Sequence, residues 1–207
     1  MVGRKYEQRL RAEAAEETRR RILDTFAEQL RNSPTDPISL DVIARHAKVA
    51  RSTIYTVFGS KAGLFDAFVE DLWSRTGLPA LTAAVGNPDA REHLRAGITA
   101  ACRMYATDRG VYRVLFSLNQ LQPDAVGMAV QKMEKERSGG MAHLARRLDE
   151  DSALRADVSV ERATDVLWML CSFDTFDSFY SERGQSVDET IDLIVDTAQR
   201  AVCRPRS

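Results

Sequence analysis

Apolar residues recur at helical spacing along almost the entire chain. One series comprises Ile22, Leu23, Phe26, Ala27 and Leu30, and a second runs from Leu64 to Trp73 at i, i+1, i+4, i+5, i+8 and i+9. Each series places its apolar residues along one face of a helix. We find no convincing segment with the period-two alternation of a half-buried strand. The sequence therefore predicts an all-α fold.

Turn signals divide the chain into separate helices. They are "NSPTDP" at residues 32–37, "GLP" at residues 77–79 and "GNP" at residues 86–88. After a first helix that ends at the first of these signals, we expect helices over residues 40–47, 51–58, 60–75, 90–107, 110–118, 123–149, 160–182 and 187–203.

The composition changes this picture little. The 207 residues are 44% hydrophobic and 29% charged, with a net charge of -1. No apolar run approaches the roughly 18 residues of a membrane helix, and residues 1–21 lack the apolar core of a signal peptide. We therefore expect a cytoplasmic protein without a membrane partner. Three widely spaced cysteines fit reduced, structural thiols better than a disulfide framework or a zinc site.

The charge is unevenly distributed. Residues 1–61 hold 12 Lys and Arg against 8 Asp and Glu, whereas residues 62–207 hold 17 against 22. The basic end can face a polyanion and the acidic remainder cannot.

Residues 40–47 and 51–58 predict two short helices with three residues between them. This is the arrangement of a helix-turn-helix, whose second helix enters the DNA major groove. That helix, "RSTIYTVF", carries several hydroxyl groups, and Arg51 at its start can bind guanine through two hydrogen bonds. Lys61 lies in the first turn of the next helix, where the helix dipole opposes a cation unless an external phosphate binds there.

The run "ISLDVIARHAKVARSTIYTVFGSKAGLFDAFVEDL" at residues 38–72 resembles the DNA-binding domain of the TetR family of transcriptional regulators. The matching elements are Ile43-Ala44, Ala47-x-Val49, Thr53-x-Tyr55, Phe58 and Ser60-Lys61-x-x-Leu64. The resemblance implies base-edge contacts from Arg51, Ser52 and Thr56. It also implies phosphate contacts from Ser39, Thr53, Tyr55 and Lys61, with Arg45 and Lys48 as flanking candidates.

Four positions depart from the family pattern, and one of them is Val57, which replaces a frequent His or aromatic residue. Lys48 replaces the usual turn glycine, which costs on the order of 1 kcal/mol if the backbone keeps a positive φ. Ala50 replaces the usual Ser or Thr cap, a loss of about 1 kcal/mol. Gly63 stands where Glu often completes a capping box. We expect it to soften the start of the helix over residues 60–75. Gly63→Ala would then stiffen this helix, which links the DNA-binding and ligand-binding sites.

The resemblance also implies a domain organisation. It comprises a basic N-terminal extension over residues 1–18, either disordered or helical, a helix-turn-helix domain over 19–59, a connecting helix over 60–75, and a ligand-binding and dimerisation domain over 76–207. Aromatic residues and methionines in the last domain are more often core than cavity, and the residues alone leave both open. The candidates for a ligand pocket are Met104, Tyr105, Tyr112, Phe116, Met133, Trp168, Phe173 and Phe176.

The segment "WMLCSFDTFDSFY" at residues 168–180 is apolar almost all round a helix, so it must be covered on two sides. In the TetR family the last two helices pair with those of a second subunit, which implies a homodimer. The candidate interface residues are Val166, Leu170, Asp174, Asp177, Ile191, Ile194 and Ala198. The pair Asp174 and Asp177 either forms ion pairs across this interface, with Arg162 or Arg200, or binds a cationic ligand.

Catalytic motifs are missing from the sequence. It holds no GxGxxG, GxxxxGKS or GxxxxGKT loop, its three histidines are isolated, and no metal, cofactor or enzymatic activity is expected. The resemblance implies a repressor that a small, largely apolar ligand releases from a palindromic operator in double-stranded DNA. The alternatives are a ligand-responsive activator, an architectural DNA-binding protein, and a helical small-molecule-binding protein or enzyme without regulatory DNA binding.

Overall fold

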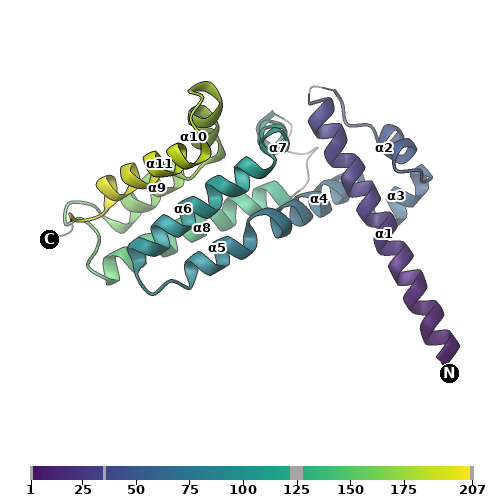
Figure 1. The fold of residues 1–207 in the computed structure, drawn as a ribbon, viewed down its shortest axis with the longest axis horizontal. Coiled ribbons are helices and arrows are strands. Elements are labelled where there is room, and N and C mark those ends of the chain that lie inside the picture. The colour runs from purple at the N-terminus through teal and green to yellow at the C-terminus, as the bar shows by residue number, and fades with distance from the viewer. Residues whose placement is uncertain (1, 35, 122–127, 206–207) are drawn as a thin grey trace. The chain divides into compact units, whose positions relative to one another are not determined.

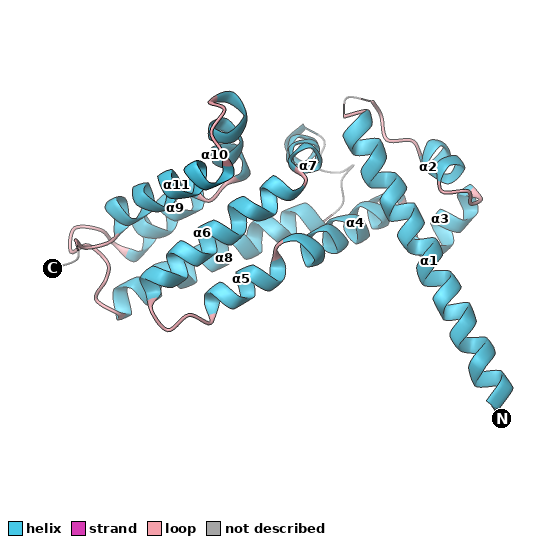
Figure 2. Cartoon of the chain, viewed as in Figure 1, coloured by secondary structure: helices cyan, strands magenta, loops and turns pink. Residues whose placement is uncertain are grey.

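The computed structural model describes residues 2–34, 36–121 and 128–205, and within them the chain is all-α, as the sequence predicts (Figure 2). The elements are α1 (Val2–Asn32), α2 (Leu40–His46), α3 (Arg51–Phe58), α4 (Lys61–Thr76), α5 (Leu78–Val85), α6 (Ala90–Thr107), α7 (Arg109–Leu121), α8 (Ala129–Glu150), α9 (Val160–Leu170), α10 (Phe173–Asp177), the π-helical turn η2 (Ser178–Glu182) and α11 (Val187–Val202). The helix α1 starts at Val2, so the basic N-terminal residues that are described are helical.

Two elements differ from the expectation. The "GLP" signal does not begin a loop, because Gly77 precedes a helix, α5, in which Pro79 occupies the first turn, where a missing N–H costs nothing. The predicted helix over residues 160–182 is wrong as a single element. It stops at Cys171, and Ser172 caps a new helix by accepting a hydrogen bond from the Thr175 N–H at 3.1 Å.

The described chain forms two compact units. Unit 1 combines residues 1–70 with residues 114–130, and unit 2 combines residues 71–113 with residues 131–207. Both units are therefore discontinuous in sequence. The boundaries fall inside α4, α7 and α8, which differs from the division at residues 59 and 75 that the family resemblance implies.

In unit 1, the apolar series of the sequence forms the core. Phe26 of α1 packs edge-to-face against Phe65 and Phe68 of α4, with ring centroids 4.8 and 5.0 Å apart. Ile43 of α2 and Ile54 of α3 are fully buried, so each short helix is anchored by one branched side chain. Such burial stabilises each helix by about 1.5–3 kcal/mol, which short helices need because they are unstable alone.

In unit 2, an aromatic cluster joins helices that are distant in sequence. Tyr105 of α6 lies edge-to-face against Tyr112 of α7 and Phe173 of α10, with centroids 5.4 Å apart in both pairs. Helix α5 packs along α6, and α11 packs against α6 and α9 (Figure 1). The end of α11 is held by the backbone pairing of Leu154 with Cys203.

Candidate DNA-binding surface and effector cavity

The turn between α2 and α3 has the backbone that its family pattern requires, but without a glycine. Lys48 has φ 54°, in the left-handed region, and the Val49 N–H donates to the Ala44 carbonyl at 2.9 Å to close the turn. The expected strain at Lys48 is thus present. Ala50 is the N-cap of α3 and offers no side-chain hydrogen bond, so the first turn of that helix keeps uncapped N–H groups.

One face of α3 is exposed and polar. Ser52, Tyr55 and Thr56 are solvent-exposed, Thr53 is half-buried, and Ile54 on the opposite face is fully buried. The Thr56 hydroxyl donates to the Ser52 carbonyl at 3.0 Å, so its oxygen remains able to accept a hydrogen bond.

Basic and hydroxyl groups flank this face. Arg45 and Lys48 are exposed, and Ser39 caps α2 by accepting a hydrogen bond from the Val42 N–H at 3.4 Å. Lys61 opens α4 and is half-buried. The nine predicted DNA contacts therefore lie within one segment of unit 1, from the cap of α2 to the first turn of α4.

Arg51 has two partners in the free protein. Its guanidinium Nη1 donates to both carboxylate oxygens of Asp41 at 3.2 and 3.1 Å, and Nη2 donates to the Tyr55 hydroxyl at 3.4 Å. All three side chains are exposed. The sequence analysis missed Asp41, although helix periodicity places it on the outer side of α2. Because the pair is solvent-exposed, it contributes little to stability.

The start of α4 corrects the interpretation of Gly63. Ser60 acts as the cap, since its hydroxyl accepts a hydrogen bond from the Gly63 N–H at 2.9 Å. A Cβ atom on Gly63 would lie 2.1 Å from the carbonyl oxygen of Phe58, whereas real Cβ contacts almost never fall under 3.0 Å. Glycine is therefore required by the close approach of α3 to α4, and the prediction that Gly63→Ala simply stiffens the helix is wrong.

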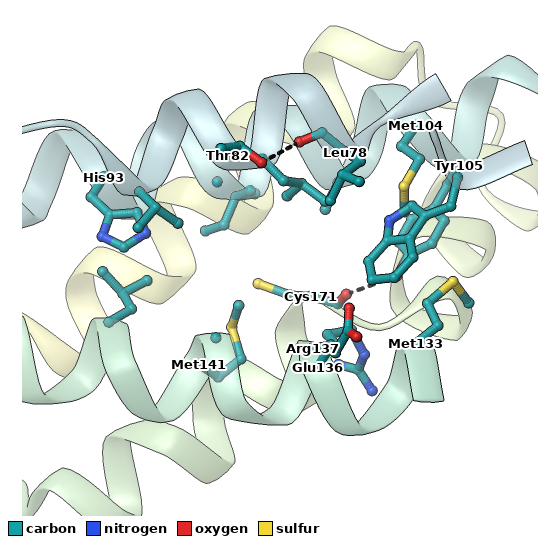
Figure 3. Close-up of a pocket in the computed structure, with 18 of the residues that line it drawn as sticks. Leu78, Thr82, His93, Met104, Tyr105, Met133, Glu136, Arg137, Met141 and Cys171 are labelled. Atoms are coloured by element: carbon teal, nitrogen blue, oxygen red, sulfur yellow. Dashed lines mark hydrogen bonds between the residues drawn. The ribbon is translucent and has the colours of Figure 1, made fainter. Parts of the chain in front are cut away.

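Unit 2 contains an apolar cavity of about 240 Å³. Its walls come from α4, α5, α6 and α8, with Cys171 closing one side. His93 lies at one end, and Met104, Tyr105 and Met133 lie at the other (Figure 3). The sequence analysis missed the α5 side, formed by Leu78, Leu81, Thr82 and Val85, because the segment was interpreted as a break.

Polar groups around the cavity are held by the protein itself. Tyr105 donates its hydroxyl hydrogen to the Cys171 carbonyl at 3.4 Å, and burial raises the pKa of that phenol. The Thr82 hydroxyl donates to the Leu78 carbonyl at 2.9 Å. Burial also raises the pKa of the Cys171 thiol to about 12, so the thiol stays protonated and unreactive.

Residues 22–68 match the family model described as bacterial regulatory proteins, tetR family. The match covers the end of α1, all of α2 and α3 and the first half of α4, including the turn at Lys48 and the polar face of α3. Residues 22–68 thus form a DNA-binding domain of the TetR type, and α2 and α3 are its helix-turn-helix.

Solved structures of TetR-family regulators share the fold. NalD, the secondary repressor of the MexAB-OprM multidrug efflux pump in Pseudomonas aeruginosa, is 23% identical with a TM-score of 0.72, over 94% of this chain and 100% of that one. A TetR-like transcriptional regulator from Rhodococcus sp. RHA1 is 23% identical with a TM-score of 0.67, over 89% and 94%. A TetR family regulator from Marinobacter aquaeolei VT8 is 17% identical with a TM-score of 0.67, over 94% and 100%. No curated protein sequence matches this chain.

Five predicted pocket residues do not line this cavity. Tyr112, Phe173 and Phe176 are buried in the aromatic cluster, and the Tyr112 hydroxyl is 2.9 Å from the hydroxyl of Thr76. Phe116 belongs to unit 1. Trp168 is 45% exposed, and the Arg137 guanidinium lies over its ring at 4.9 Å. Aromatic residues at helical spacing were here mostly core, which is the more frequent outcome.

Three residues that were predicted to lie in the dimer interface are buried inside the subunit instead. Ile191, Ile194 and Ala198 are buried within unit 2, because the clean stripe of α11 faces its own subunit. The exposed apolar side chains on these helices are instead Trp168 and Met169 of α9 and Leu193 of α11. Val166 and Leu170 are half-buried.

The two aspartates have separate environments. Asp177 pairs within unit 2, where its carboxylate accepts hydrogen bonds from Arg109 at 3.3 Å and Arg113 at 2.9 Å. Burial pushes its pKa up, but hydrogen bonds from Ser181 and Arg113 outweigh burial and hold the pKa below the usual range. Asp174 is exposed. Asp177 is thus paired within its own subunit, which fits neither an ion pair across the dimer interface nor a ligand site shared with Asp174.

Two further searches bear on partners. None of the helices among the described residues is long and apolar enough to cross a lipid bilayer. The same residues contain no group of three or more His, Cys, Asp or Glu side chains that could hold a metal ion.

Proposed function

We propose that this protein is a homodimeric, cytoplasmic repressor that a small, largely apolar ligand releases from a palindromic operator. The observation that carries the proposal is the presence, in one chain, of an exposed polar recognition helix and an apolar cavity of about 240 Å³. The structural likeness to NalD, which is named as a repressor, supports repression as the direction of control.

The proposed DNA contacts are those that the family resemblance implies, and the exposure of most of these side chains supports them. In the proposed complex, Arg51, Ser52 and Thr56 meet base edges in the major groove. The proposed phosphate contacts are Ser39, Thr53, Tyr55 and Lys61, with Arg45 and Lys48 on the flanks. Arg51 must leave Asp41 to reach guanine, and the exchange is favourable because a bidentate guanine contact contributes about 1–3 kcal/mol, more than an exposed ion pair.

The proposed dimer uses the exposed faces of α9 and α11. Trp168, Met169 and Leu193 supply apolar area there, and half-buried Val166 and Leu170 extend it. The symmetric pairing of two helices from each subunit gives a four-helix bundle. Asp174 lies at the rim of this face in the proposal, where it stays solvated.

Helix α4 is the proposed transmitter, because it carries residues of both sites. Lys61 lies in its first turn, and Trp73 lines the cavity. The α-helical rise places them about 18 Å apart along the axis. A ligand that displaces Trp73 moves α4 and changes the separation of the two recognition helices, which must match half-sites about 34–36 Å apart. By reciprocity, DNA weakens ligand binding by the same factor.

The test is in vitro selection of DNA sites followed by footprinting and salt titration. One palindromic site is expected, whereas coverage without sequence preference would indicate an architectural protein. Arg51→Ala should lose about 1–3 kcal/mol of discrimination at one base pair per half-site. Lys61→Ala should weaken binding to every sequence and reduce the salt slope by about one unit per subunit. An unchanged slope would remove Lys61 from the DNA contacts.

A further inference from the structure

The charge of the cavity wall restricts which ligands can bind. Six ionisable side chains line the cavity, and the rest of the wall is mainly apolar. Tyr105 and Cys171 stay protonated because burial raises their pKa, which leaves His93, Glu134, Glu136 and Arg137. An acidic ligand needs a cation or several free hydrogen-bond donors to replace the water that it loses on burial. The available cations therefore decide whether anions bind.

Arg137 is already neutralised. Its Nε and Nη2 donate to the two carboxylate oxygens of Glu134 at 3.0 and 2.6 Å, and its Nη1 donates to the Trp168 carbonyl at 2.6 Å. Only 12% of its side chain is exposed. An anion that took this guanidinium would leave Glu134 partly buried without its partner, which is strongly unfavourable.

His93 is neutral at pH 7. Arg147 Nη1 lies 3.2 Å from its Nδ1, and because arginine can only donate, Nδ1 accepts and the ring proton is on Nε2. Burial, with the nearby Arg147 and His143, lowers the pKa of His93 to about 4. The remaining charge is Glu136, which is exposed on the wall and has no ion-pair partner among the residues that the structure describes.

We infer that the effector carries no negative charge and has an apolar body about the size of one aromatic ring with a short chain, and that the cavity rejects carboxylates and phosphates. The inference rests on the proposed function for assigning the effector to this cavity. Two features of the wall support it. Arg137 is already paired with Glu134, so this cation is not available to a ligand. Glu136 adds a negative charge that repels an anion. The size follows from the volume of about 240 Å³, since a cavity of about 150 Å³ holds benzene.

The experiment compares three probes with the same ring and a three-carbon chain: propiophenone, 3-phenylpropionate and 3-phenylpropylamine. Their dissociation constants with the full-length protein are measured by calorimetry at pH 7. Propiophenone should bind at least tenfold more tightly than 3-phenylpropionate. Glu136→Gln should improve 3-phenylpropionate binding severalfold, because it removes the repulsion between two carboxylates. It should leave propiophenone binding unchanged, because propiophenone carries no charge.

Matched glycine variants locate the binding site. Gly97 lines the cavity, and a Cβ there meets no atom within 4 Å, so the side chain of Gly97→Leu can start from the wall without a clash at its Cβ. Circular dichroism of the variant checks that the fold is kept. Gly139 has equally open surroundings, is exposed and does not line the cavity, so Gly139→Leu is the control. Propiophenone binding should disappear in Gly97→Leu and persist in Gly139→Leu.

Each outcome is informative. If 3-phenylpropionate binds as tightly as propiophenone and Gly97→Leu abolishes that binding, the inference is overturned and the effector cavity of the proposed function stands. Binding of 3-phenylpropylamine at least as tight as that of propiophenone agrees with the inference, because the wall then repels negative charge only. If no probe binds, or if binding survives Gly97→Leu, the cavity is not the effector site, and both the inference and that part of the proposed function fail.

Discussion

Replacing Gly63 by alanine should destabilise unit 1, although alanine is the better helix former. The added Cβ would lie 2.1 Å from the Phe58 carbonyl oxygen, so the end of α3 and the start of α4 must separate. Overpacking of this kind costs about 1–3 kcal/mol. The gain in helix propensity is about 1 kcal/mol. The net expectation is a loss of up to about 2 kcal/mol in the free energy of unfolding.

Gly139→Ala is the control for the gain in helix propensity, because it makes the same Gly-to-Ala change without the close contact. Gly139 lies within α8, is exposed, and has no atom within 4 Å of an added Cβ, so alanine there should stabilise by about 1 kcal/mol. Urea unfolding followed by far-ultraviolet circular dichroism measures both variants. The difference between them, about 1–3 kcal/mol, is the contribution of the close contact alone. Equal stabilisation of the two would refute the argument that Gly63 is required by packing.

Three further changes test other parts of the structure. Lys48→Gly should raise the free energy of unfolding by about 1 kcal/mol in urea titrations, because it relieves the positive φ; no gain would mean that the turn is unstrained. Leu193→Arg should yield monomers in light scattering, with Leu121→Arg, exposed outside α9 and α11, as the control; persistence of the dimer would move the interface. Asp177→Asn should destabilise unit 2 by about 1–3 kcal/mol at pH 7. Since the folded pKa of Asp177 is depressed, that difference should begin to shrink below the unfolded pKa of about 3.9 and vanish once the pH has fallen through the folded pKa. A difference that persists in acid would exclude the charge of Asp177 as its cause.

The sequence predicted the recognition region well because its signals are local. The strain at Lys48 and the missing cap at Ala50 each depend on residues within one turn, and the structure contains both. Asp41 was missed because its pairing with Arg51 spans ten residues and two helices. The requirement for Gly63 was equally hidden, since it arises from a backbone oxygen in a different helix.

Prediction was weaker in unit 2, where the assignments depend on tertiary contacts. Periodicity identified the apolar stripe of α11, but an apolar stripe does not say whether its own subunit or a partner covers it. Ile194 is buried and Leu193, its neighbour in sequence, is exposed. Likewise, Met104 and Tyr112 have similar sequence surroundings, but one lines the cavity and the other fills the core.

The discontinuity of unit 1 affects how the protein is made. The unit needs residues 114–130 as well as residues 1–70, and the Ala129 N–H donates to the Asp66 carboxylate at 2.7 Å within it. During synthesis at about 5–20 residues per second, α1 to α4 therefore leave the ribosome several seconds before their last packing partners exist. Throughout that interval, apolar surface on the DNA-binding segment stays uncovered. The same interleaving means that a gene fragment ending after α4 encodes an incomplete folding unit, and that exchange of DNA-binding domains between regulators of this kind requires both segments to be transferred together.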